Sequence, residues 1–167
     1  MAIEVVREYF QKFGLNNRIQ EFEVSSATVE LAAQALGVEP ARIAKTLSFK
    51  SEEGAILIVA AGDVKIDNSK FKEEFGMKAK MLTPEEVVKY IGHAVGGVCP
   101  FGIPSEVQVY LDESMKRFET MFPAAGSSNS AIELSLEELY QYSNAVKWVD
   151  VCKLREVFDL TKPIGKE

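Results

Sequence analysis

The chain has 167 residues, 47% of them hydrophobic and 26% charged, which is an ordinary globular composition, and its formal net charge is −6. A length in this range fits one domain, which we expect over 1–167, and neither a membrane span nor a signal peptide is indicated, so we expect a soluble cytoplasmic protein. The acidic charge argues against broad, non-specific nucleic-acid binding, and we expect no DNA partner. Two cysteines with one histidine argue against a disulfide framework or a zinc site, so we expect no metal and no cofactor.

The first half of the chain has the pattern of short helices and strands separated by glycine, proline and capping residues. In chain order we predict a helix over 2–13, a strand over 20–24, a helix that Ser25 and Ser26 can cap and Gly37 ends, and a turn or short helix at Pro40. A hairpin follows, with strands over 44–50 and 55–61 joined by a turn over 51–54. We then predict a helix from the Asp67–Asn68 cap to 75, a half-buried strand over 77–81 and a helix over 84–91 that Thr83 caps.

The second half begins with a glycine-rich loop over 92–102. After it we predict a strand over 107–111, a brief helix to 118, an extended segment over 119–124, a polar turn over 126–130, a strand over 131–134, a helix over 135–142, a strand over 145–151 and a helical turn over 154–158. This irregular alternation favours an α+β domain with a mixed, strongly curved, barrel-like sheet flanked by short helices, and not a doubly wound parallel sheet.

One lysine lies on the apolar face of a predicted strand. In the strand over 44–50, Lys45 alternates in phase with Leu47 and Phe49, while Thr46 and Ser48 point to the other face. An inward lysine loses hydration unless it meets an anion. The alternative is that Lys45 lies at the strand end and extends its ammonium group to water.

The loop over 92–102 concentrates four glycines, one proline and the only histidine of the chain. Glycine permits positive φ and close approach of the backbone to a ligand, so such a loop can point its N–H groups at a carbonyl or phosphate oxygen. The alternative is a tight connection between two elements. We expect this loop and the strand start at Lys45 to face one cleft.

The common catalytic motifs, namely the Walker loop, dinucleotide fingerprint, zincin helix and nucleophile elbow, are missing. Cys99 and His93 could form a thiol nucleophile and its base, but they lie six residues apart in one loop and Pro100 follows the cysteine. We therefore prefer oxyanion or phosphate binding without a protein nucleophile.

Three motifs, in this order, resemble the YbaK/EbsC-type aminoacyl-tRNA deacylases, which are free-standing relatives of the editing insertion domain of prolyl-tRNA synthetase. They are Ala44-Lys-Thr-Leu47 after a helix ending Ala-Leu-Gly-Val, Gly96-Gly-Val-Cys-Pro-Phe-Gly102, and Ala125-Gly-Ser127 with Ile132-Glu-Leu-Ser-Leu-Glu-Glu-Leu139. The resemblance covers residues 20–150 and implies a single YbaK-like domain.

The resemblance implies a trans-editing hydrolase that deacylates misacylated tRNA, with tRNA for proline carrying a small wrong amino acid as the expected substrate. The partners it implies are the acceptor end of aminoacyl-tRNA and, as a candidate, prolyl-tRNA synthetase, with no membrane. It assigns catalytic roles to Lys45 and to backbone donors at Gly96 and Gly97, without a protein nucleophile. Substrate-binding positions would be Thr46, His93, Val98, Cys99, Pro100, Phe101, Gly102, Gly126 and Ser127.

Two positions depart from the family pattern. Some members have an aspartate in the last capping helix, where this chain has Glu137 and Glu138, and others have an N-terminal tyrosine where this chain has Phe22. The amino acid that is removed does not follow from the sequence, because pocket volume decides between small side chains. A different class of function, a tRNA- or synthetase-binding module that turns nothing over, stays open at this point.

Overall fold

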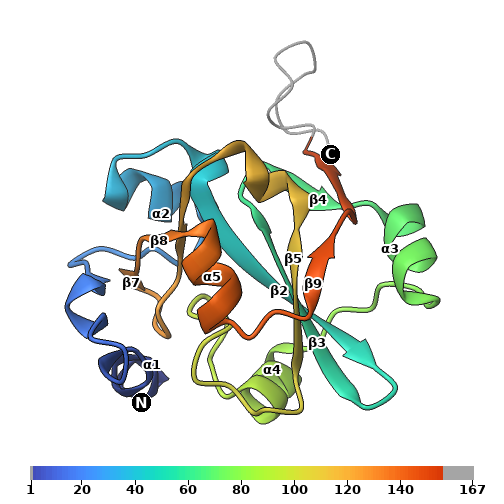
Figure 1. Ribbon diagram of the computed structural model, residues 1–167, viewed down its shortest axis with the longest axis horizontal. Coiled ribbons are helices and arrows are strands. Elements are labelled where there is room, and N and C mark those ends of the chain that lie inside the picture. The colour runs from blue at the N-terminus through green and yellow to red at the C-terminus, as the bar shows by residue number, and fades with distance from the viewer. Residues whose placement is uncertain (1, 156–167) are drawn as a thin grey trace.

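The computed structural model describes residues 2–155, which fold around one mixed six-stranded sheet (Figure 1). Its strands lie in the order β8-β6-β2-β3-β5-β9. The pairs β8-β6 and β2-β3 are antiparallel, and the pairs β6-β2, β3-β5 and β5-β9 are parallel. The bounds are β2 (Ile43–Ser51), β3 (Gly54–Ala61), β5 (Gln108–Asp112), β6 (Thr120–Pro123), β8 (Leu134–Ser135) and β9 (Lys147–Val149).

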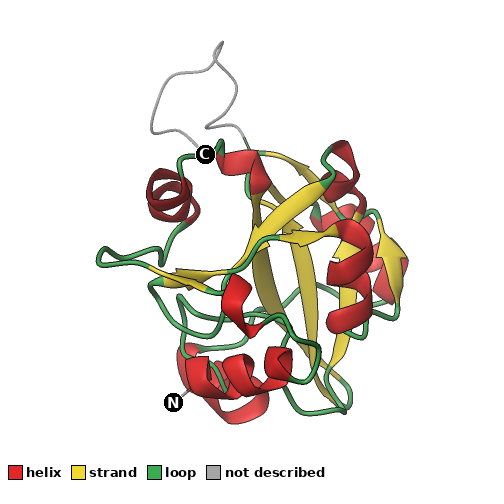
Figure 2. Cartoon of the chain, turned by 60° about the vertical axis from the view of Figure 1, so that its left-hand side comes forward, coloured by secondary structure: helices red, strands yellow, loops and turns green. Residues whose placement is uncertain are grey.

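Two short antiparallel pairs complete the strands. They are β1 (Gln20–Glu21) with β7 (Ser130–Ala131), and β4 (Val64–Ile66) with β10 (Cys152–Leu154). Figure 2 shows that the large sheet is curled and not flat. The expected α+β class with a mixed, strongly curved sheet is therefore confirmed.

The helices are short and surround the sheet. They are α1 (Ala2–Gln11), α2 (Val29–Leu36), α3 (Asn68–Phe75), α4 (Pro84–Ile91) and α5 (Leu136–Tyr142), with 3₁₀ turns at Asn16–Arg18, Pro40–Arg42 and Glu113–Arg117. Both α4 and α5 begin with a complete capping box, from Thr83 and Ser135, as the sequence predicts. Within residues 2–155 no helix is long and apolar enough to cross a membrane.

The sheet has apolar clusters on both faces. The larger cluster takes alternate residues of β3, including Leu57 and Val59, and adds α1, α4, α5 and the glycine-rich loop. The smaller cluster takes the intervening residues, including Ile56 and Ile58, and packs them against α3, β4 and β10. A strand that is covered on both faces explains why 55–61 is a continuous apolar run.

The structure corrects several predicted boundaries. The cap of α2 is Thr28 and neither of the predicted serines, because only its hydroxyl reaches the Leu31 N–H, at 3.2 Å. The predicted strand over 77–81 is reduced to one bridge between Phe49 and Met81. The predicted strand over 131–134 is split into β7 and β8, β4 was missed, and residue 154 belongs to β10, while the rest of the predicted turn over 154–158 lies largely outside the described residues.

Candidate active site

A cavity of about 380 Å³ opens along the edge of β2. It is lined by the residues that lead into α2 and by α2 itself, by the segment 81–87 and by part of the glycine-rich loop. The first half of β2 and the ends of β6 and β7 also border it. The cavity thus joins segments that are far apart in the sequence, and it contains Lys45 together with part of the glycine-rich loop.

The edge of β2 has a gap in its backbone pairing at the cavity. Before the gap, β2 pairs with β6 at residues 43–44. Beyond it, the Leu82 N–H donates to the Ser48 carbonyl at 3.1 Å and the Lys50 N–H donates to the Lys80 carbonyl at 2.8 Å. Because hydrogen-bonding directions alternate along a strand, Thr46 points its N–H and C=O to this same edge, where the structure records no backbone partner for either.

The side chain of Thr46 adds a further polar group at the gap. Its Oγ1 atom is buried and has no hydrogen-bond partner within the described part of the protein. A buried hydroxyl without a partner costs free energy comparable to a lost hydrogen bond. Thr46 therefore presents three polar groups to this edge of the cavity, and a ligand with matching polar groups would be stabilised there.

Lys45 lines the cavity but directs its ammonium group away from the glycine-rich loop. Its Nζ donates to the carbonyl of Val64 in β4. Burial lowers the pKa of Lys45, and the positive charge of Arg155 lowers it further. Among residues 2–155 no carboxylate forms an ion pair with Lys45. Asp63 and Glu30 act on this half-buried cation only from beyond ion-pair distance, which leaves it available to an anion.

The expectation of one common cleft needs a correction. Lys45 shares a sheet face with Leu47 and Phe49, as predicted, and this face carries the smaller apolar cluster. Cys99 and Phe101 of the loop pack into the larger cluster on the opposite face. The strand start and the loop therefore border the same cavity at the sheet edge, but the Lys45 ammonium group and the loop core lie on different faces.

The glycine-rich loop offers backbone donors at Gly96 and Val98, both of which line the cavity. No backbone or side-chain acceptor is recorded for either N–H among the described residues. The N–H of Gly97, in contrast, donates to the Ala94 carbonyl at 3.0 Å and is already used inside the loop. The candidate donors are consequently Gly96 and Val98, whereas the sequence suggested Gly96 and Gly97.

Gly97 has a packing role that the sequence did not reveal. A Cβ atom at this position would lie 2.7 Å from the backbone N and Cα of Ser127. The two glycine-containing loops are therefore in backbone contact at this point. Gly126 packs in the same way against α1, where a Cβ would lie 2.8 Å from the Ala2 carbonyl. Neither Gly126 nor Ser127 lines the cavity, but Ser130 of the same loop does.

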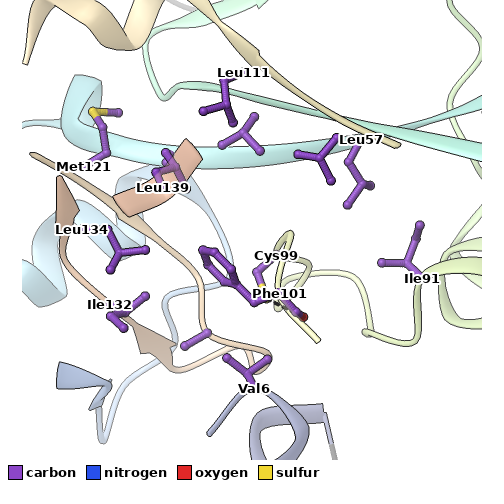
Figure 3. Close-up of a cluster of buried hydrophobic side chains, with 14 of the residues drawn as sticks. Val6, Leu57, Ile91, Cys99, Phe101, Leu111, Met121, Ile132, Leu134 and Leu139 are labelled. Carbon is purple, nitrogen blue, oxygen red and sulfur yellow. Dashed lines mark hydrogen bonds between the residues drawn. The ribbon is translucent and has the colours of Figure 1, made fainter. Parts of the chain in front are cut away.

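The other predicted substrate-binding positions lie away from the cavity. Cys99 and Phe101 are fully buried in the larger cluster, and Figure 3 shows them beside Val6 of α1. Pro100 and Gly102 border a separate hollow near Tyr9. Burial raises the pKa of the Cys99 thiol to about 12, so this thiol is not available as a thiolate near neutral pH.

His93 is a buried loop residue, as the sequence analysis favoured. Its Nε2 lies 2.8 Å from the Phe101 carbonyl and 3.6 Å from Cys99 Sγ. The contact with a carbonyl requires the proton on Nε2, so Nδ1 is the acceptor, and this atom has no partner among the described residues. His93 therefore joins two ends of the loop through a hydrogen bond, and it does not line the cavity.

The two departures from the family pattern also lie outside the cavity. Phe22 pairs through its backbone with Asn129, N–H to carbonyl at 2.8 Å. Glu138 belongs to the capping box of α5 and forms an ion pair with Arg18 at 2.9 Å. Cavity residues that the sequence analysis missed include Ala27, Thr28 and Ser130. Their only signal was the presence of small polar residues near the two turns, which is too common to identify a site.

We expect the stability of the protein to fall as pH drops below 6.5. Burial lowers the pKa of His93 from its ordinary value of 6.5, so the folded protein keeps the imidazole neutral while the unfolded chain gains a proton. The loss can approach about 1.4 kcal/mol per pH unit between 6.5 and the lowered pKa. Urea unfolding at several pH values measures it. His93→Gln should remove this slope, since His93 is the only histidine, and an unchanged slope would contradict the assignment.

A model of the aminoacyl-tRNA editing domain matches residues 23–142. The chain is 55% identical to the uncharacterized protein YwhH of Bacillus subtilis, over 92% of this chain and 98% of the relative. It is 29% identical to a proposed Cys-tRNA(Pro)/Cys-tRNA(Cys) deacylase, EbsC, of Enterococcus faecalis, over 70% of this chain and 73% of the relative.

A solved structure supports the same relationship. The structure of a proposed trans-editing enzyme for prolyl-tRNA synthetase matches with a TM-score of 0.82 and 29% identity, covering 91% of this chain and 97% of that chain. The resemblance inferred from the three sequence motifs is therefore confirmed. Because the domain model covers well over half of the sequence, the chain belongs to the aminoacyl-tRNA editing domain family.

Proposed function

We propose that this protein is a free-standing aminoacyl-tRNA deacylase that acts in the cytoplasm on tRNA carrying a wrong amino acid. Tests should start with tRNA for proline carrying a small residue, because the EbsC relative is a proposed Cys-tRNA(Pro) and Cys-tRNA(Cys) deacylase and the structural relative a proposed trans-editing enzyme. Prolyl-tRNA synthetase is the candidate protein partner on the same ground.

The observation that carries the proposal is a cavity with unpaired backbone donors, whose lining has serine and threonine hydroxyls but no histidine or carboxylate to activate them. Gly96 and Val98, whose N–H groups have no recorded acceptor among the described residues, border it, while burial withdraws the Cys99 thiol from reaction. Donors that are fixed before the reaction stabilise the oxyanion of a tetrahedral intermediate, and one such donor is worth roughly 3–4 kcal/mol in other enzymes. This arrangement suits ester hydrolysis by a small external nucleophile.

In the proposed reaction, the oxygen of a water molecule or of a substrate ribose hydroxyl attacks the ester carbonyl carbon. The carbonyl oxygen becomes an oxyanion that accepts hydrogen bonds from Gly96 and Val98. The bond between the carbonyl carbon and the ribose oxygen then breaks, and the ribose oxygen takes the proton that the attacking oxygen gives up. With water as the nucleophile, the products are the free amino acid and the uncharged tRNA; attack by the ribose hydroxyl would need a second, hydrolytic step.

Lys45 has the charge to hold the substrate. It is the lysine that lines the cavity, and no carboxylate among the described residues neutralises it directly. A phosphate of the terminal nucleotide is the matching anion, since a compact ammonium group binds phosphate as a point charge. A protein with a net charge of −6 has little positively charged surface to contact the tRNA backbone over a long distance. We therefore place the main contact at the acceptor end of the tRNA.

A panel of misacylated tRNAs tests the function. Each tRNA would be incubated with catalytic and then with stoichiometric amounts of protein, and loss of the aminoacyl group would be measured. We expect multiple turnovers with at least one small amino acid on tRNA for proline. Tight binding without loss of the amino acid at stoichiometric protein would contradict the proposal and identify a binding module.

The variant Cys99→Ala should keep most of the deacylase activity, because the buried thiol does not border the cavity. Its main effect should be on stability, with a loss of about 1–2 kcal/mol from removing a packed sulfur atom. Single-turnover deacylation and urea unfolding measure the two effects separately. An inactive but stably folded Cys99→Ala protein would instead indicate thiol catalysis.

A further inference from the structure

We propose that the open edge of β2 binds the terminal adenine of the substrate through its N1 and N6 positions. This inference rests on the proposed function and names the part of the tRNA that the cavity recognises. It assigns the recognition to the main chain of Thr46 and Ser48, so that no particular side chain is needed for the base contact. Thr46 adds its hydroxyl group beside this edge.

The edge presents donor, acceptor and donor groups in sequence. The Thr46 N–H, the Thr46 C=O and the Ser48 N–H all point away from β3, because the neighbouring groups at Ser48 C=O and Lys50 N–H bond to the segment 80–82. None of the three has a recorded partner among residues 2–155. Adenine carries the complementary pair on one edge, with N1 as an acceptor and N6 as a donor.

The charges around the gap favour a neutral base over the α-ammonium group of the amino acid. No aspartate or glutamate is among the residues that line the cavity, whereas Lys45 is. Arg155 lies close enough to Lys45 to lower its pKa further. A second ammonium group at Thr46 would lose hydration and would meet the positive charge of Lys45 with no carboxylate in the cavity lining to compensate it, since Asp63 and Glu30 act on Lys45 from outside the cavity. Adenine is neutral, so it carries no such cost.

The lining of the cavity suits the apolar faces of a base. Alkyl side chains from α2, the preceding turn and the segment 82–98 border it; they are Ala27, Val29, Ala32, Leu82, Val87 and Val98. Apolar walls with a few polar groups at one edge are typical of small-ligand sites. The edge of adenine that carries N1 and N6 is the one farthest from the sugar, so it would reach deepest, where Thr46 Oγ1 is buried.

The main test compares ligands on the unchanged protein. The probe is 3′-alanylamino-3′-deoxyadenosine, in which an amide replaces the ester and prevents hydrolysis. It would be compared by calorimetry with the 1-deaza, 7-deaza and 6-desamino forms. We expect the 1-deaza and 6-desamino forms to bind about tenfold or more weakly, because each leaves a buried main-chain group unpaired. The 7-deaza form, which differs only on the other edge, should bind like the parent.

Equal binding of all four probes would overturn the inference, and a selective loss with the 7-deaza form would overturn the assigned edge. Thr46→Val serves as a control: it removes Oγ1 and keeps the main chain, so the difference between the 1-deaza and 7-deaza forms should persist. Deacylation of misacylated tRNA by the same preparation separates the two proposals. Activity with no discrimination between probes contradicts adenine recognition alone, and inactivity toward every tRNA contradicts the proposed function.

Discussion

Lys45→Ala should lower kcat/KM for deacylation by about 100-fold, since a hydrogen bond to a charged group contributes about 1.5–3 kcal/mol. The physical reason is that this cation has no ion-pair partner of its own in the described part of the protein. Its ammonium group is half-buried, contacts the Val64 carbonyl, and has no direct carboxylate partner among the described residues. An anionic group of the substrate would therefore gain more from Lys45 than from an exposed lysine.

Two further variants sharpen this test. Lys45→Arg should recover little activity, because a planar guanidinium group does not reproduce a compact ammonium group in a confined space. Lys50→Ala is the matched control on the same strand, since its ammonium group is already paired with Glu86 at 3.2 Å, and it should stay active. Circular dichroism and urea unfolding check the fold. The contact with Val64 implies a modest stability loss for Lys45→Ala, about 1 kcal/mol.

The variant His93→Ala tests the alternative that the histidine, and not Lys45, is needed for deacylation. His93 lies in the core of the loop and not at the cavity, so at neutral pH its loss should reduce activity much less than the loss of Lys45. A dead His93→Ala protein beside an active Lys45→Ala protein, both folded, would overturn the assignment. It would indicate general-base catalysis from the loop.

Gly97→Ala should impair both stability and deacylation. The added Cβ would lie 2.7 Å from the N and Cα atoms of Ser127 and 2.8 Å from its carbonyl carbon, and backbone atoms cannot rotate away. The two loops must separate, at a cost of about 1–3 kcal/mol for overpacking. The same shift moves the N–H groups of Gly96 and Val98, and a misplacement of about 1 Å can reduce a rate by about 100-fold.

Two controls separate this effect from ordinary loss of a glycine. Gly76→Ala introduces a Cβ with no heavy atom within 4 Å, although its φ of +69° makes it a strained position. It should lose about 1 kcal/mol or more of stability. Its activity should be unchanged under conditions in which the protein stays folded. Ser127→Gly should not rescue Gly97→Ala, because the clash is with backbone. Wild-type activity in Gly97→Ala would show that the loop contact does not position the site.

Local patterns in the sequence determined most of the elements. The capping boxes at Thr83 and Ser135 and the glycines that end helices are short-range signals, and the structure has helices where they predict them. The phase of β2 was also readable, because alternation along a strand is a local property: Lys45 does share a face with Leu47 and Phe49. The three motifs, taken together and in order, were specific enough to predict the family.

Only the tertiary structure decided which groups meet at the cavity. The glycine-rich loop turns Cys99 and Phe101 into the core and leaves Gly96 and Val98 at the cavity, a choice that depends on packing against α1 and the central strands. The gap at Thr46 exists because β6 ends on one side of it and residues 80–82 pair on the other. These are contacts between segments far apart in the chain, and local spacing does not encode which backbone groups such contacts leave unpaired.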